Sequence, residues 1–300
     1  MKFINHTIKK KEYTLNNNYT DNKLVLISDI HYSSSFKKEK LNIILEEVAK
    51  ENPNYICITG DIIDSNKTVE DDKLRSEILE FINNLSKIAK VIISIGNHDK
   101  YKLIRRAFRC IHEYQDNQSW FNTLSTLKNV YLLDNGSITF DNITFTGITL
   151  SDNYYKNEGE NNHNIISELN EKLKIENRNY NLLLIHSPIH VLEENTYENT
   201  DVKKIDLILS GHTHNGVMPP ILDDIFKGNN GLFSPSNKWF SKAKFTRGKC
   251  QYKNTNLIIN GAITKIHECS PKVLVPLNEL FPMSVDVINL VSNNEKNISK

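Results

Sequence analysis

The sequence predicts an α/β fold with a largely parallel sheet. Two segments, residues 41–48 and 74–88, repeat apolar side chains at helical spacing. Short apolar runs bounded by polar or turn residues are typical of strands, and they cover residues 23–28, 55–59, 91–95, 143–146, 182–185, 207–210 and 257–259. Strand and helix therefore alternate at the start of the chain, which indicates right-handed βαβ crossovers.

The predicted strands are expected to be buried on both faces. Their apolar character is nearly continuous, as expected where helices cover one face and a second sheet or further helices cover the other. No internal repeat and no Pro- or Gly-rich linker divides the sequence, so we expect one domain over residues 1–300. Residues 215–251 contain Pro219, Pro220 and Pro235 without a sustained period, and we expect a long functional loop or cap there.

Composition weighs against several classes of function. The chain has 37 Lys and Arg against 36 Asp and Glu, so its net charge of +1 gives no electrostatic case for nucleic-acid binding. The four cysteines are scattered without a CxxC pair, which argues against a structural zinc site and fits a reducing compartment. No run approaches the roughly 20 apolar residues that a membrane span needs. We therefore expect a cytoplasmic protein, or one that contacts a membrane only peripherally.

Residues of the types that bind metals follow five of the predicted strands. They occur as SDIH at 28–31, GD at 60–61, GNHD at 96–99, a histidine at 186 and GHTH at 211–214. In an open parallel sheet the carboxyl ends of the strands form the edge where ligands bind. Carboxylates, imidazoles and one amide suit Mn²⁺, Fe or Zn²⁺, and the absence of cysteine argues against a thiolate site. A carboxylate such as that of Asp61 can bridge two cations about 3.5–4 Å apart.

In this order, DxH, GD, GNHD, a single histidine and GHTH resemble the motifs of the calcineurin-like metallophosphoesterase superfamily. The resemblance implies a sandwich of two mixed β-sheets flanked by helices, with a dinuclear metal centre at the sheet edge. It implies a first metal held by Asp29, His31, Asp61 and His214. It implies a second metal held by Asp61, Asn97, His186 and His212. It also implies that His98 contacts the scissile phosphate and assists the leaving group, while Asp99 orients His98.

The same resemblance implies a hydrolase of phosphate esters that uses a metal-activated hydroxide and forms no covalent intermediate. We expect a phosphodiester or pyrophosphate bond in an amphiphilic substrate, because the GHTH-Asn-Gly continuation and the loop after it look similar to bacterial members whose substrates are uncharacterised or related to membrane lipids. A phosphomonoesterase and a non-catalytic scaffold of the same fold are the alternatives, and the intact ligand set speaks against the scaffold. The near-neutral charge weighs against a nuclease. The sequence indicates neither which of Mn, Fe and Zn is native nor the oligomeric state.

Several residues near the motifs have two interpretations. His190 follows His186 by four residues, but the strand-end position favours His186 as the ligand. Asp64 either supports the metal site or caps the next segment, and we favour the structural role. Arg105 and Arg109 either approach a substrate phosphate or lie on a solvated basic helix face, and we favour the helix face.

The segment 233–245 interleaves Trp239, Phe240 and Phe245 with three lysines. This mixture suits an interfacial membrane contact or a greasy substrate. It suits a folded cap with a small core of its own equally well.

Overall fold

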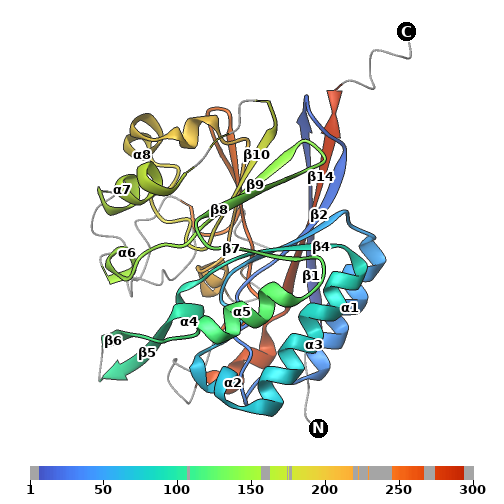
Figure 1. Cartoon of the computed structure of the whole chain (residues 1–300), viewed down its shortest axis with the longest axis vertical. Coiled ribbons are helices and arrows are strands. Elements are labelled where there is room, and N and C mark those ends of the chain that lie inside the picture. The colour runs from blue at the N-terminus through green and yellow to red at the C-terminus, as the bar shows by residue number, and fades with distance from the viewer. Residues whose placement is uncertain are drawn as a thin grey trace.

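The computed structural model describes residues 7–106, 109–156, 163–173, 175, 178–218, 222, 229, 245–266 and 274–293. Over these residues the chain forms two six-stranded sheets that pack against each other, with helices on the outer faces (Figure 1). A separate hairpin consists of β5 (Tyr101–Arg106) and β6 (Arg109–Tyr114). The predicted sandwich of two mixed sheets flanked by helices is confirmed.

The first sheet contains the βαβ units that the sequence predicts. In spatial order its strands are β1 (Ile8–Asn17), β14 (Met283–Ser292), β2 (Asn22–Ile27), β3 (Tyr55–Thr59), β4 (Lys90–Ser94) and β7 (Val130–Leu133). Every neighbouring pair is parallel except β14 and β2, which are antiparallel. Its outer face packs against α1 (Glu39–Glu51), α3 (Asp72–Ile88) and α5 (Gln118–Thr126).

The second sheet is parallel at its centre and antiparallel at both edges. Its strands, in spatial order, are β12 (Gly248–Tyr252), β13 (Thr255–Ile259), β11 (Leu207–Ser210), β10 (Tyr180–Ile185), β9 (Ile143–Ile148) and β8 (Gly136–Phe140). The two antiparallel pairs are β12 with β13 and β8 with β9. Its outer face packs against α6 (Asp152–Lys156), α7 (His163–Lys172) and α8 (Glu194–Asn199).

Alternation along the strands divides the core into three layers. In β2, Leu24 and Leu26 pack between the two sheets, whereas Val25 and Ile27 pack beneath the helices of the first sheet. All four side chains are fully buried. Because successive side chains of a strand point to opposite faces, a strand covered on both faces must be apolar throughout. This explains the nearly continuous apolar runs in the sequence.

Some elements differ from the prediction. The described part of the basic segment, residues 102–106 and 109, does not form a helix, because β5 and β6 pair as an antiparallel hairpin with Arg105 opposite Cys110. The strands contain Tyr101, Ile104 and Ile111, residue types that favour an extended chain. Pairing of the two strands gives their backbone amides and carbonyls hydrogen-bond partners. The expected loop 215–251 ends earlier than we predicted, since β12 begins at Gly248 and pairs with β13. Most of that loop, including residues 233–244, lies outside the described residues.

Strands β1 and β14 were not predicted from the sequence. Strand β1 lies at the edge of the first sheet and alternates partly buried and exposed residues, with only Leu15 and Asn17 buried. Strand β14 is largely buried, yet Ser284, Asp286 and Asn289 interrupt its apolar run. Buried polar residues of this kind hide a strand from a search for continuous apolar character.

Asp286 of β14 is a buried carboxylate with a single polar side chain to pair with it among the described residues. Asn260, which follows β13, donates from Nδ2 to Asp286 Oδ2 at 2.9 Å. Burial raises the pKa of Asp286 to about 6 from an ordinary value of 3.8.

Replacing Asp286 by Asn should therefore change stability in a pH-dependent way. The raised pKa means that the native state retains a proton that the unfolded chain has lost, so this group's contribution to stability falls as the pH rises through about 6. Relative to the parent, Asp286→Asn should be more stable at pH 8 than at pH 5 by about 1.4 kcal/mol, because at pH 5 the native carboxyl is still mostly protonated and the unfolded one is mostly ionised. Urea unfolding of the metal-free proteins at both pH values measures the difference. Glu80→Gln, whose parent side chain is 65% exposed, is the control, and equal effects of Asp286→Asn at both pH values would contradict the prediction.

Candidate metal centre

The five strand-end segments of the sequence meet at one edge of the sandwich. Asp29 and His31 follow β2, Asp61 follows β3, and Asn97 begins the short helix α4 (Asn97–Lys100) after β4. From the second sheet, His186 follows β10, and His212 and His214 follow β11. Each of these side chains belongs to a residue that is at most 9% exposed. Both sheets therefore contribute to a single buried cluster.

Left-handed backbone turns direct these side chains into the cluster. The φ angles of the candidate ligands in this conformation lie between 47° and 67°, and the residues are Asp29, His31, Asp61, His212 and His214. Non-glycine residues adopt such angles uncommonly, and where they do the strain often marks a functional site. Backbone hydrogen bonds hold the turns together, because the amides of Asp29 and His31 donate to the carbonyls of Gly60 and Asp61 at 3.1 and 3.0 Å.

The glycines before Asp61, Asn97 and His212 have two different roles. Only Gly60 is left-handed, with a φ of 82°. At Gly96 an added Cβ would overlap the Asp61 carboxylate, and at Gly211 it would overlap Ser28 Oγ and Asp29 Oδ2. Glycine is therefore needed at the last two positions because another segment approaches closely, rather than for its backbone angles.

A first group of donors contains Asp29, His31 and His214. Asp29 Oδ1 lies 3.4 Å from His214 Nε2 and 3.8 Å from His31 Nε2. The Asp29 carboxylate is itself fixed, since it accepts hydrogen bonds from Ser28 Oγ at 2.6 Å and from the His212 amide at 2.9 Å. These contacts leave the Asp29 oxygens and the two Nε2 atoms around one small volume.

A second group contains Asp61, His186 and His212. Asp61 Oδ2 lies 3.0 Å from His186 Nε2, and His186 Nε2 lies 3.2 Å from His212 Nδ1. The same Asp61 oxygen is 3.6 Å from His31 Nε2 in the first group. Asp61 thus stands between the two groups.

The donor set fits divalent cations. Donors that share a cation at about 2.0–2.2 Å stand roughly 3–3.5 Å apart, close to the separations found here. The side-chain oxygen of Asn97 is buried without a hydrogen-bond partner among the described residues. A buried amide oxygen of this kind costs free energy unless something binds it, and a cation would do so.

Hydrogen bonds at Nδ1 orient two of the candidate ligand histidines, and a carboxylate faces Nδ1 of a third. His186 Nδ1 donates to the Thr59 carbonyl at 2.6 Å, and His214 Nδ1 donates to the Lys265 carbonyl at 3.1 Å. His31 Nδ1 lies 3.3 Å from Asp64 Oδ1. A histidine whose Nδ1 carries the proton presents Nε2 as a lone-pair donor, which is the arrangement common in metal sites.

Asp64 lies beside the centre, a position that favours the supporting role over the structural role that we preferred. The next helix, α2 (Asn66–Glu70), has Ser65 at its N-cap and no side-chain capping hydrogen bond. Instead, the Asp64 side chain faces His31 Nδ1, and its backbone carbonyl accepts a hydrogen bond from His98 Nδ1 at 2.8 Å. The position of Asp64 three residues after Asp61 did not distinguish support of the metal site from capping of the next segment.

His98 and Asp99 both lie at the centre, but Asp99 does not bond to the His98 ring. The Asp99 carboxylate accepts the amides of Asp61 and Gly96 at 2.8 and 2.9 Å, and those of Ile62 and Ile63 at 3.0 and 3.3 Å. Asp99 therefore fixes the backbone of the GD and GNHD loops, and Asp64 occupies the orienting position that we expected for Asp99. Burial and the nearby Asp61 charge raise the pKa of Asp99 to about 6.

The carboxylates make the centre attractive to positive charge. Burial alone would lower the pKa of His186, but Asp61 and Asp29 outweigh it and raise that pKa to about 10. Burial would raise the pKa of Asp61, but His186, His98 and His31 hold it well below its usual range. In the protein without metal, protons on imidazole partly balance the carboxylates, a task that cations would take over.

His190 belongs to neither donor group. Its Nδ1 lies 2.6 Å from Glu193 Oε1, and it is absent from the clusters of possible ligands among the described residues. The structure thus brings His186, rather than His190, to the candidate centre.

Comparison with known proteins places the chain in a family. The family model described as calcineurin-like phosphoesterase matches residues 23–216. The chain belongs to the calcineurin-like phosphoesterase family. This confirms the resemblance seen in the motifs.

Similar proteins carry names of the same class. An uncharacterized metallophosphoesterase of Helicobacter pylori is 28% identical over 201 residues, which are 66% of this chain and 46% of that protein. The uncharacterized metallophosphoesterase YkuE of Bacillus subtilis is 24% identical over 295 residues, which are 96% of this chain and 87% of that protein. The chain thus spans about half the length of the Helicobacter pylori relative.

A solved structure of a dimetal phosphatase from Danio rerio superposes with a TM-score of 0.41 and 12% identity. The match covers 80% of this chain and 87% of that one.

Among the described residues, no helix has both the length and the apolar character needed to cross a membrane.

The close approach at Gly211 can be tested by adding one methyl group. Gly211→Ala should weaken Mn²⁺ binding at least about tenfold and destabilise the protein by roughly 1–3 kcal/mol, because the new Cβ displaces Ser28 and Asp29. Isothermal titration calorimetry and thermal unfolding measure the two effects. Gly136→Ala is the matched control, since an added Cβ there meets no atom within 4 Å. Equal Mn²⁺ affinity in the two variants would refute this account of Gly211.

The contact between Asp64 and His31 can be tested separately. Asp64→Ala should reduce Mn²⁺ affinity about 10–100-fold, because His31 loses the group that fixes its ring. Asp71→Ala is the control, since Asp71 caps α3 through the amides of Lys73 and Leu74. That variant should lose about 1 kcal/mol of stability with unchanged Mn²⁺ affinity. The reverse pattern would return Asp64 to a structural role.

Proposed function

We propose that this chain is a metal-dependent hydrolase of phosphate esters with a dinuclear metal centre. The observation that carries the proposal is the position of Asp61 between the two donor groups, since its Oδ2 lies 3.6 Å from His31 Nε2 and 3.0 Å from His186 Nε2. The family match over residues 23–216 supports the same chemistry.

The residues divide into two sets of proposed ligands. The first metal is held by Asp29, His31, Asp61 and His214. The second is held by Asp61, Asn97, His186 and His212. When bound, two divalent cations polarise the phosphoryl group and lower the pKa of water, so that hydroxide is accessible near neutral pH. Mn, Fe and Zn all suit these ligands, and the proposal does not depend on which is native.

His98 is the proposed proton donor to the leaving group. Its Nδ1 donates to the Asp64 carbonyl, so a protonated ring would present Nε2–H as the second donor. The ring stands edge-on to His31, with the ring centroids 4.5 Å apart, which keeps it next to the proposed metals. Asp99 supports His98 indirectly by fixing the loop from which His98 projects.

We propose a phosphodiester or pyrophosphate substrate with an amphiphilic body, and a phosphomonoester is the second candidate. The non-catalytic scaffold is disfavoured because six of the seven candidate ligands fall into two donor groups that could each hold a metal ion. Peripheral membrane contact through residues 233–245 stays a hypothesis, since residues 233–244 lie outside the described part of the chain.

Model substrates test the proposal directly. Metal-free protein reloaded with Mn²⁺ should hydrolyse bis-p-nitrophenyl phosphate in preference to p-nitrophenyl phosphate. Asp61→Ala should abolish the activity because it removes the shared ligand, and His98→Ala should lower kcat about 10²–10⁴-fold. Steady-state kinetics and metal analysis of each variant separate the two effects, since His98→Ala should retain its metals.

The outcomes distinguish the candidates. A preference for the monoester would favour a phosphomonoesterase. A fully metal-loaded protein with no activity toward either substrate would favour the scaffold.

A further inference from the structure

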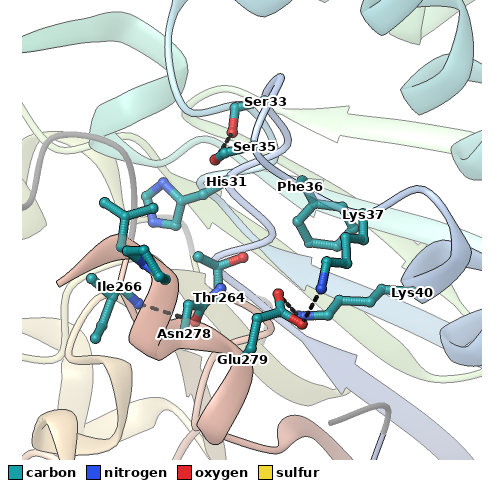
Figure 2. Close-up of a pocket in the computed structure, with 12 residues that line it drawn as sticks. His31, Ser33, Ser35, Phe36, Lys37, Lys40, Thr264, Ile266, Asn278 and Glu279 are labelled. Carbon is teal, nitrogen blue, oxygen red and sulfur yellow. Dashed lines mark hydrogen bonds and ion pairs between the residues drawn. The ribbon is translucent and has the colours of Figure 1, made fainter. Parts of the chain in front are cut away.

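A cavity of about 310 Å³ opens beside the candidate metal centre. His31, a proposed metal ligand, lies in its wall, and Figure 2 shows the ring at one side of the cavity. The opposite side holds Lys37 and Lys40, which precede and begin α1, together with Glu279 (Figure 2). Glu279 belongs to the 3₁₀ helix η3 (Val275–Leu280). A volume of this size suits part of a small molecule.

Two lysines in this cavity share one carboxylate. Lys37 Nζ lies 2.8 Å from Glu279 Oε2, and Lys40 Nζ lies 2.9 Å from Glu279 Oε1. Among the described residues, these are the only ion pairs of either lysine. The group as a whole therefore has one positive charge in excess.

The excess positive charge costs free energy because part of it lies on a buried lysine. The Lys40 side chain is only 4% exposed, although Lys37 and Glu279 are 33% and 23% exposed. A buried cation needs a partner of its own, and one lysine would have sufficed to tie η3 to α1. The second lysine is thus better explained by an anion that the cavity receives.

Apolar atoms make up most of the exposed cavity wall, although Ser33, Ser35, Thr264 and Asn278 also line it. Phe36 lies on the lysine side, with Lys40 Nζ 6.0 Å from its ring centroid. Ile266, Val275 and Pro276 also line the cavity, and Figure 2 shows Ile266 on the side away from the lysines. An apolar wall with one cationic end suits a group that combines an organic body with a negative charge.

We propose that this cavity binds a second anionic group of the substrate, next to the phosphate that is hydrolysed, with Lys37 and Lys40 as specificity-determining residues and Glu279 as their resident counter-ion. The inference rests on the proposed hydrolase, because it assigns the cavity to the substrate of that site. The second anion is a phosphoryl group, as in a diphosphate ester, or a carboxylate on the leaving group. In either case it competes with Glu279 for the two ammonium groups.

Three substrates with common aryl groups test the proposal. They are bis(4-nitrophenyl) phosphate, bis(4-nitrophenyl) diphosphate, and the phosphodiester of 4-nitrophenol with 4-hydroxybenzoate. Hydrolysis of the diphosphate adds water across the P–O–P link and releases two molecules of 4-nitrophenyl phosphate. The measured quantity is kcat/KM for each two-anion substrate, divided by that for bis(4-nitrophenyl) phosphate.

Lys37→Met and Lys40→Met should lower this ratio about ten- to hundredfold, the loss expected for a hydrogen bond between charged groups. Glu279→Gln should raise it, because the competing charge is removed while the shape is kept. Lys50→Met, at a lysine of α1 that is 67% exposed, is the control and should leave the ratio unchanged. A response confined to the diphosphate identifies a phosphoryl group, and one confined to the benzoate diester identifies a carboxylate.

Binding to metal-free protein separates this inference from the proposed hydrolase. Inorganic pyrophosphate should raise the melting temperature of the parent and of Lys50→Met, raise it less in Lys37→Met and Lys40→Met, and raise it more in Glu279→Gln. If these melting-temperature shifts are found but the metal-loaded protein hydrolyses none of the substrates, the proposed hydrolase is wrong and the anion site is supported. Hydrolysis with equal ratios and equal melting shifts in the parent and the lysine variants would overturn the anion site alone.

Discussion

The centre depends on the placement of the Asp61 carboxylate in a space that admits little else. One of its oxygens accepts the His98 amide at 2.8 Å, and the other lies between His31 and His186. Gly96 approaches so closely that a single methyl group would overlap the carboxylate. Because these contacts fix the Asp61 carboxylate, it faces both groups of metal-ligand donors at once. A mobile side chain would lose conformational entropy in adopting the same position.

The sandwich makes this placement possible. Asp61 and His31 come from the first sheet, whereas His186 comes from the second, so the donors meet only because both sheets end at the same edge. The layer of Leu24, Leu26 and their neighbours from the second sheet fixes the distance between those edges. Close packing of this layer is therefore a condition for the separations of 3.0–3.8 Å among the donors.

Different parts of the molecule contribute to the free energy of folding with opposite signs: the apolar layers stabilise the fold, and the metal centre destabilises it. Five candidate ligands have left-handed backbones, and buried carboxylates stand among buried imidazoles. Each left-handed residue costs of the order of 1–3 kcal/mol, and the apolar layers offset that cost. Cations would relieve the carboxylates and the imidazoles but not the backbone, so the turns remain strained in the loaded protein as well. The cavity beside the centre also contains a costly arrangement that the surrounding structure maintains, because the ammonium group of Lys40 is held there with a side chain only 4% exposed.

The sequence by itself determined the α/β class, the central strands and the seven candidate ligands, because continuous apolar runs and strand-end motifs are local patterns. It did not reveal β14, whose Asp286 and Ser284 break the apolar run, or the β5–β6 hairpin, whose basic residues resemble a solvated helix. Only the tertiary structure decided that Asp64 rather than Asp99 faces the histidines, and that Lys37 and Lys40 share Glu279 from the far end of the chain. Such pairings depend on where distant segments come to rest, and no local pattern of residues encodes that distance.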